Sequence, residues 1–106
     1  MKNLTIIEDE IDIKGQIYRL EYVDKSFEFN GTLADATVDN NEKLITINRN
    51  AKDVDRLIRH ELIHAYFDEC NLPCYSNNEV LVNWLAYSIP EIEYSVATLL
   101  NSLKEE

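Results

Sequence analysis

The stretch His60-Glu61-Leu62-Ile63-His64 governs how the rest of this chain is interpreted, because it holds both histidines of the sequence four residues apart. Residues at this spacing lie on one face of an α-helix, about one turn from each other. The residues from Ala51 to Arg59 lead into the motif and continue its helical pattern. Apolar side chains recur at helical spacings through both segments: Val54, Leu57, Ile58, Leu62 and Ala65. We therefore expect an amphipathic helix that presents both imidazoles on one side.

The H-E-x-x-H pattern is typical of a metal site. Two imidazoles one turn apart can bind a single ion, and Glu61 lies beside it. Catalytic zinc has three protein ligands and a water molecule, whose pKa falls toward about 7. We expect Glu61 to take the proton of that water and to pass it to the leaving amine. The pattern predicts a Zn²⁺ hydrolase, although manganese, cobalt or iron could use the same kinds of ligand.

The third metal ligand must be a carboxylate or a cysteine, because the chain has no third histidine. Glu79 is the best candidate, since it lies at the asparagine-rich start of a second predicted helix, residues 77–87. Asn83 follows Glu79 by four residues and could orient a ligand histidine through a hydrogen bond. The predicted ligands are thus His60, His64 and Glu79. The alternatives are an exposed glutamate favoured by the helix dipole at Glu79 and an ordinary surface amide at Asn83.

The two cysteines directly after the motif helix are a weaker ligand candidate. Cys70 and Cys74 are separated by three residues, which is neither the redox spacing C-x-x-C nor half of a zinc knuckle. We expect reduced, semi-buried loop residues; a disulfide and a competing metal site are the alternatives.

The two helices together resemble a known group of proteins. Residues Asp55 to Glu69, followed by Glu79 and then Val82-Asn83-Trp84-Leu85-Ala86, are similar to the small HExxH proteins of phages and mobile elements. Those proteins are related to ImmA/IrrE-type metallopeptidases, in the gluzincin branch of the zincins. The resemblance covers roughly residues 43–92. It implies a minimal zincin-like fold, zinc-dependent peptidase activity and a regulatory target such as a repressor.

The sequence departs from these relatives at Asn83, where they often carry aspartate. An amide oxygen still accepts a hydrogen bond but brings no negative charge. The histidine that it orients would therefore be a weaker donor to zinc, and activity could be low even with zinc bound.

Length and charge limit the function classes. A chain of 106 residues, 45% hydrophobic, is long enough for one core and too short for two, so we expect one domain over residues 1–106. The net charge of −10 argues against nucleic acid and favours solubility or, weakly, a basic peptide partner. We do not expect Met1 to Glu10 to act as a signal peptide, because acidic residues follow a short apolar run, and no stretch of the sequence approaches about 20 apolar residues. We expect a cytoplasmic protein without a membrane span.

The first half of the chain predicts strands, which makes the fold class α+β. The expected strands are Ile11–Ile13, Gln16–Val23, Thr32–Val38 and Lys43–Asn48, the last two joined as a hairpin by Asp39–Glu42. A small antiparallel sheet would then precede the helices. Lys43–Asn48 is expected beside the metal, either with an open edge that pairs with an extended peptide or fully paired inside the sheet.

Two prolines are expected to limit the predicted helices. Pro73 is expected to stop the motif helix, and Pro90 to end or kink the glutamate-bearing helix. A last helix, Glu91–Leu103, would follow, and Trp84 would anchor the core. The expected buried stripe of the last helix consists of Ile92, Val96, Leu99, Leu100 and Leu103.

Three functions remain open from the sequence. The leading one is a zinc endopeptidase that cleaves an extended peptide or protein substrate. The second is a zincin-fold binding module with a retained zinc site and no turnover, because no side chain is assigned to stabilise the oxyanion; Tyr66, Tyr75 and Tyr87 are candidates. The third is an interaction protein that docks through its acidic surface or its final helix. The sequence does not specify the substrate or the oligomeric state.

Overall fold

The structure is a computed structural model that describes residues 6–105. Its first two strands form a β-hairpin. Strands β1 (Ile6–Ile13) and β2 (Gln16–Val23) pair antiparallel. The turn between them needs two positive φ angles, 54° at Lys14 and 91° at Gly15, and the Gly15 amide donates to Asp12 Oδ1 at 2.8 Å. Such two-residue turns match the twist of the flanking strands. The predicted strand Gln16–Val23 is confirmed, and β1 starts earlier than the sequence pattern indicates.

The hairpin is part of a four-stranded sheet of order β1-β2-β6-β5. Strands β5 (Ala36–Asp39) and β6 (Leu44–Asn48) pair antiparallel, which confirms the predicted hairpin. Because β6 runs parallel to β2, the sheet is mixed, and the expectation of a purely antiparallel sheet is wrong. The open edge considered for Lys43–Asn48 is also wrong, since β6 lies between two strands. The outer strand on this side is β5.

The predicted strand Thr32–Val38 is divided at Asp35. Its first part, β4 (Thr32–Ala34), pairs with β3 (Phe27–Phe29) in a separate two-stranded sheet. Asp35 interrupts the strand because its carboxylate accepts hydrogen bonds from Ser26 Oγ at 2.5 Å and Asn48 Nδ2 at 3.0 Å. Fixing this side chain turns the backbone, so the second part joins the main sheet as β5.

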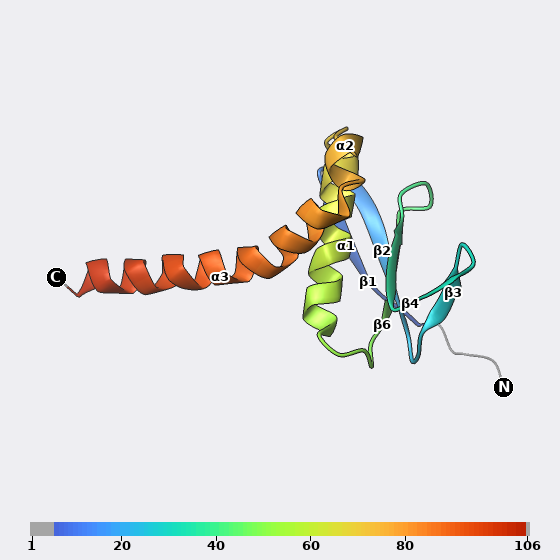
Figure 1. The fold of residues 1–106 in the computed structure, drawn as a ribbon, viewed down its shortest axis with the longest axis horizontal. Coiled ribbons are helices and arrows are strands. Elements are labelled where there is room, and N and C mark those ends of the chain that lie inside the picture. Colours follow the sequence, from blue (N-terminus) through green and yellow to red (C-terminus); the bar gives the residue numbers. More distant parts are fainter. Residues whose placement is uncertain (1–5, 106) are drawn as a thin grey trace.

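Helix α1 (Val54–Glu69) covers one face of the main sheet (Figure 1). The predicted motif helix is confirmed, but it starts at Val54 rather than Ala51 because Asp53 has a left-handed φ of 54°. Alternate residues of the strands face the helix, as the strand period requires. The buried core consists of Ile13, Tyr18, Leu20, Ile45, Ile47 and Ala65, with Val54, Ile58 and Leu62 packed against it.

A polar cluster fixes the C-terminal end of α1 to the sheet. Glu69 Oε2 accepts hydrogen bonds from the Tyr18 hydroxyl at 2.6 Å and Asn40 Nδ2 at 3.3 Å, and it forms an ion pair with Lys43. These bonds hold the pKa of Glu69 below its usual value, with the Lys43 contact as the largest cause. The cluster therefore joins α1 to β2 and to the β5–β6 turn.

Pro73 acts differently from the prediction, and of the two outcomes predicted for Pro90, an end or a kink of the helix, the end is wrong. Pro73 does not stop α1, which ends at Glu69; it begins the short helix α2 (Pro73–Ser76), where its missing N–H costs no helical hydrogen bond. Pro90 does not end the next helix, because α3 runs unbroken from Glu79 to Lys104. Two predicted helices are thus one, and α3 bends along its length (Figure 1).

Only the first half of α3 packs on the rest of the fold. Val82 and Ala86 are buried, whereas the second half projects from the body and stretches the molecule to 60 × 32 × 26 Å (Figure 1). The predicted core anchor Trp84 is 58% exposed, so that prediction is wrong. The buried stripe predicted for the last helix is wrong for the same reason: its five residues are all exposed, by 41–65%. None of the helices within residues 6–105 is long and apolar enough to cross a membrane.

Candidate metal centre

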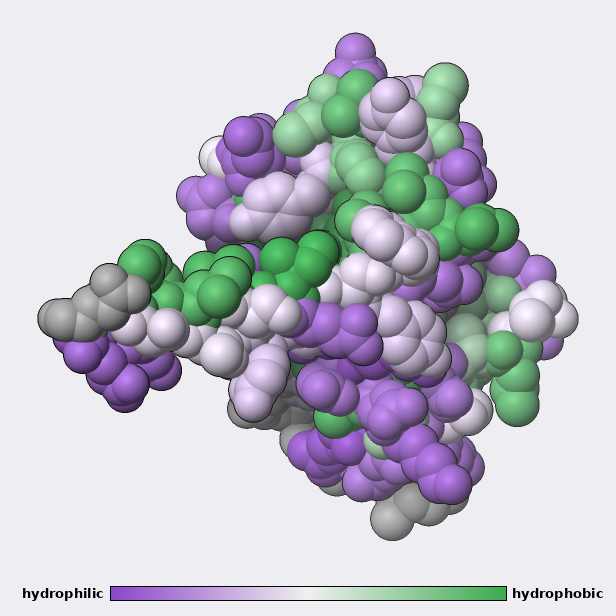
Figure 2. Space-filling view, turned by 60° about the vertical axis from the view of Figure 1, so that its left-hand side comes forward, coloured by the Kyte–Doolittle hydropathy of each residue, from purple (hydrophilic) through white to green (hydrophobic). Residues whose placement is uncertain are grey.

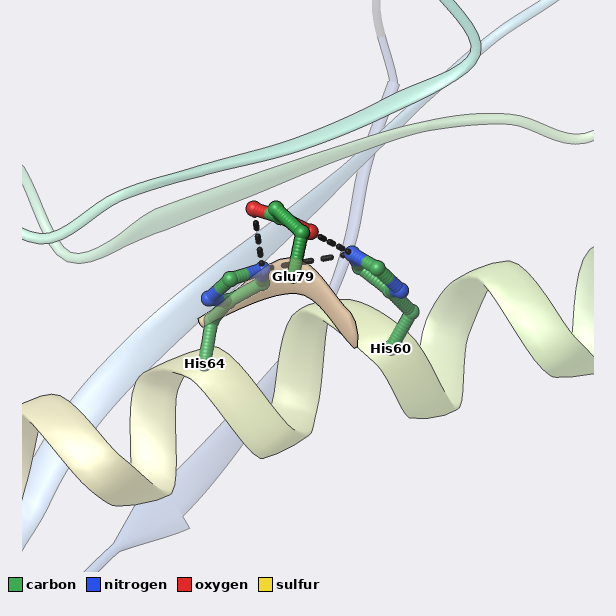
Figure 3. Close-up of side chains that lie close together, drawn as sticks. All are labelled: His60, His64 and Glu79. Atoms are coloured by element: carbon green, nitrogen blue, oxygen red, sulfur yellow. Dashed lines mark hydrogen bonds and ion pairs between the residues drawn. The ribbon is translucent and has the colours of Figure 1, made fainter. Parts of the chain in front are cut away.

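His60 and His64 lie one turn apart on α1 and extend toward the same point. Their Nε2 atoms are 3.2 Å apart, and the ring planes are inclined by 63° (Figure 3). The side chains are only 15% and 12% exposed. The helical spacing of the motif thus brings two imidazole nitrogens together in a partly enclosed place.

Glu79 reaches the same point from the first turn of α3. The short α2 reverses the chain after α1, and Asn78 then caps α3 by accepting a hydrogen bond from the Leu81 amide at 3.1 Å. One carboxylate oxygen of Glu79 lies 3.2 Å from His60 Nε2 and the other 3.3 Å from His64 Nε2 (Figure 3). The three side chains predicted as ligands are therefore brought together, with their ligand atoms within 4.8 Å of one another.

The spacing of these atoms is close to the spacing of ligands around a metal ion. Zinc binds histidine nitrogen and carboxylate oxygen at about 2.0–2.2 Å, so neighbouring ligand atoms around a tetrahedron are about 3.3 Å apart. The two Nε2 atoms are 3.2 Å apart, and each lies 3.2–3.3 Å from a different oxygen of the Glu79 carboxylate. With one ligand atom taken from each residue, the three atoms lie within 4.8 Å of one another. The chemistry of the donors agrees, because two imidazoles and one carboxylate form a frequent catalytic zinc set. The group could hold a metal ion.

Ser76 contacts the ring of His64, and sequence reasoning missed it. Its buried hydroxyl lies 3.2 Å from His64 Nδ1 and donates to the His64 carbonyl oxygen at 3.4 Å. In the tautomer of His64 that carries its proton on Nδ1, the ring donates to this hydroxyl, and the hydroxyl donates to the carbonyl oxygen. The lone pair of His64 then lies on Nε2, toward Glu79. No sequence signal marks this serine among the chain's others; its role depends on how α2 packs beside α1.

His60 has its own orienting contact. Asn83, one turn after Glu79 on α3, makes a side-chain hydrogen bond to His60, and this bond raises the histidine pKa. That is the effect of an amide oxygen that accepts a proton from the ring. Burial and the neighbouring His64 outweigh it, so the pKa of His60 is lowered overall. A lowered pKa favours neutral imidazole, which is the form that binds metals.

Glu61 is the buried acid of the site. It is only 7% exposed, and burial, with a smaller contribution from the charge of Glu79, raises its pKa to about 7. A general base works best when its pKa lies near the working pH. The side chain is therefore tuned for proton transfer near neutrality.

An open cleft of about 420 Å³ lies in front of these residues. His60, Glu61, His64 and Glu79 line it, together with these further residues: Phe29, Ala36, Thr37, Val38, Asp68, Ser76 and Asn77. The cleft thus lies between α1, the outer strand β5 and the start of α3.

Other candidates lie outside the cleft lining. None of Tyr66, Tyr75 and Tyr87 lines it. Cys70 and Cys74 are free thiols, as expected, but they are exposed rather than semi-buried and do not join the metal-binding group.

The residues that sequence reasoning did not single out near the site are Thr37, Asp68, Ser76 and Asn77, and only the fold brings them to the cleft. The architecture is a mixed α+β arrangement of sheets and three helices with a His60–His64–Glu79 group at its centre. No protein-family model, curated protein or solved structure matches this chain.

Proposed function

We propose that this protein is a zinc-dependent endopeptidase with a minimal zincin-like fold. The observation that carries the proposal is the convergence of His60 Nε2, His64 Nε2 and the Glu79 carboxylate at separations of 3.2–3.3 Å, beside a buried acid. His60, His64 and Glu79 hold the ion, and Ser76 and Asn83 orient the two histidines. The HExxH spacing and the glutamate on the next helix support a gluzincin-type assignment.

The chemistry divides between the ion and Glu61. A zinc ion held by His60, His64 and Glu79 would polarise the scissile carbonyl and lower the pKa of a water molecule at the site. Glu61 accepts the proton of the attacking water and delivers it to the departing amine nitrogen. Burial raises the pKa of Glu61 to about 7 in the metal-free protein, which offsets the lowering that a nearby cation would cause.

The outer strand β5 supports an extended peptide as the substrate. Ala36, Thr37 and Val38 line the cleft, and within residues 6–105 β5 is paired with a strand on one side only. A peptide that adds to this edge through backbone hydrogen bonds lies along the cleft, with its carbonyl groups near His60 and His64. The strand that would pair with the substrate peptide is thus β5 rather than β6.

Asp68 gives the cleft a preference for a basic side chain. It lies one turn beyond His64 on α1, lines the cleft, and adds to the negative charge of Glu79. Lysine or arginine in the substrate is therefore favoured on the His64 side. The overall charge of −10 attracts the same class of peptide over a longer distance.

The cleft lining also favours a second candidate function. Within residues 6–105, no tyrosine, arginine or lysine lines the cleft, and the donors there are neutral groups such as the Asn77 amide and the Thr37 hydroxyl. A protein that binds peptides beside a retained zinc site, without turnover, has the same geometry.

Two measurements test the proposal. Untagged wild-type protein should contain about one zinc per chain by elemental analysis, and Glu79→Ala prepared in the same way should contain far less. A peptide library incubated with zinc-loaded protein should show cleavage by mass spectrometry, absent in Glu61→Gln and retained in Glu91→Gln, an exposed control on α3.

The outcomes separate the candidates. Zinc in wild type without Glu61-dependent cleavage would overturn the peptidase and support the binding module. Absence of zinc from wild type, or equal zinc in Glu79→Ala, would refute the ligand set itself.

A further inference from the structure

The exposed apolar residues of α3 form a heptad pattern. Ile89, Ile92, Val96, Leu99 and Leu103 recur at alternating spacings of three and four residues and are 36–65% exposed. This period places them in one line along the helix, as in a coiled coil. We call these five residues the α3 seam. Figure 2 shows apolar side chains gathered along one side of the projecting helix and hydrophilic ones along the other.

The α3 seam continues onto the body of the protein. Ile89, its first residue, also lines an apolar hollow of about 330 Å³ between α1 and α3, together with Leu62, Ile63, Tyr66 and Phe67 from α1. The hollow and the seam thus make one contiguous apolar surface. Monomeric proteins rarely expose such surfaces, which usually mark interaction sites.

We propose that the α3 seam binds the α3 seam of a second copy of this chain, with the two helices antiparallel. In that arrangement Ile92 of one copy packs on Leu103 of the other, and Val96 packs on Leu99. The two-fold symmetry of the dimer makes each of these two contacts occur twice. The C-terminal end of each helix then reaches Ile89 of the other copy, at the mouth of the apolar hollow.

The charges beside the α3 seam favour a second copy of α3 in the antiparallel orientation. Glu93 and Lys104 are three helical turns apart, so they lie on the same flank of the α3 seam. Antiparallel pairing brings Glu93 of each copy near Lys104 of the other, which gives two opposite-charge contacts. In an in-register parallel pair, Glu93 of one copy and Lys104 of the other would be about three helical turns apart and would make no such contact. The projecting helix is therefore complementary to a reversed copy of itself.

The size of the surface sets the expected affinity. Covering the exposed parts of the seam residues in both copies buries on the order of 1,000 Å², at the lower end for specific interfaces. A pairing of about two heptads is also short. We expect a reversible dimer with a dissociation constant on the order of 10 µM.

Sedimentation velocity of the full chain over a range of about 5 to 500 µM tests the dimer. Wild type should shift from monomer to dimer, Leu99→Glu should weaken dimerisation by at least about tenfold, and Asn101→Glu, with the same added charge on the opposite helix face, should not. Circular dichroism should show both variants folded, because both positions are exposed. A wild-type monomer throughout, or equal effects of the two variants, overturns the proposal.

The orientation has a separate test in a background with Cys70 and Cys74 replaced by serine. A mixture of Ile92→Cys and Leu103→Cys chains should form a mixed disulfide dimer under mild oxidation, and each chain alone should form much less. Self-linking of either variant as the main product would refute the antiparallel arrangement. The charge-exchanged double variant Glu93→Lys with Lys104→Glu should dimerise like wild type, whereas Lys104→Glu alone should not.

Discussion

Replacing Glu61 with glutamine should stabilise the metal-free protein at high pH, because the wild-type fold must otherwise bury a charged carboxylate. Glu61 is 7% exposed, and its pKa is raised from 4.5 to about 7. The folded state therefore binds this proton more tightly than the unfolded state does. The stability that protonated Glu61 contributes is fully present below about pH 4.5 and is lost as the pH rises through about 7.

The difference between the two pKa values sets the size of the effect. Each pKa unit corresponds to about 1.4 kcal/mol, so the charged group lowers the free energy of unfolding by about 3 kcal/mol at pH 8. Glutamine has the same shape and no charge, so it avoids this cost. The gain of Glu61→Gln over wild type should grow from near zero at pH 4.5 to about 3 kcal/mol at pH 8.

The assay is urea unfolding followed by circular dichroism, in a chelating buffer, at several pH values between 4.5 and 8. Comparing the two proteins at each pH cancels the other titrating groups. Glu91→Gln, which removes an exposed charge, should show no such growth with pH. A gain that does not change with pH would refute the reasoning. Added zinc should reduce the gain, since a nearby cation favours the charged carboxylate.

Three further substitutions test individual contacts. Ser76→Ala should weaken zinc binding by about tenfold in competition with a chromophoric chelator, because His64 loses the hydroxyl that contacts its Nδ1; equal affinity would show that Ser76 does not orient this ring. Asn83→Asp should tighten zinc binding by about tenfold and raise the pKa of His60, measured by NMR titration of the metal-free protein; an unchanged histidine pKa would contradict the contact. Tyr18→Phe should lower the free energy of unfolding by about 1–2 kcal/mol in urea, because it removes the hydroxyl that donates to the partly buried Glu69 Oε2; no loss would mean that Lys43 and Asn40 satisfy this oxygen without Tyr18.

The sequence predicts the placement of the main site residues because their spacing follows helical geometry. His60 and His64 need only one helix to meet, and Glu79 needs only a second helix that starts close after the first. Ser76 could not be predicted in this way. Its role depends on the path of the connection between α1 and α3, where no repeating pattern constrains the backbone.

The sequence predicts less well where burial depends on tertiary packing. Apolar residues at helical spacing on α3 indicate that one face avoids water, but they do not specify what covers it. The pattern therefore predicts that Ile92 and Leu99 are buried, whereas both are exposed in the fold. Asp35 shows the same limit for strands, because contacts with Ser26 and Asn48, distant in sequence, break a continuous strand pattern.

Glu79 is the first residue of a helix of 26 residues, which is about 39 Å along its axis. The site therefore lies at one end of a long helix. Glu79 at this end contacts His60 and His64, and the other end projects from the body. A rotation of a few degrees at Glu79 displaces Lys104 by several ångströms. A spectroscopic label near Lys104 would thus amplify small movements of this carboxylate that a probe beside the histidines would hardly register.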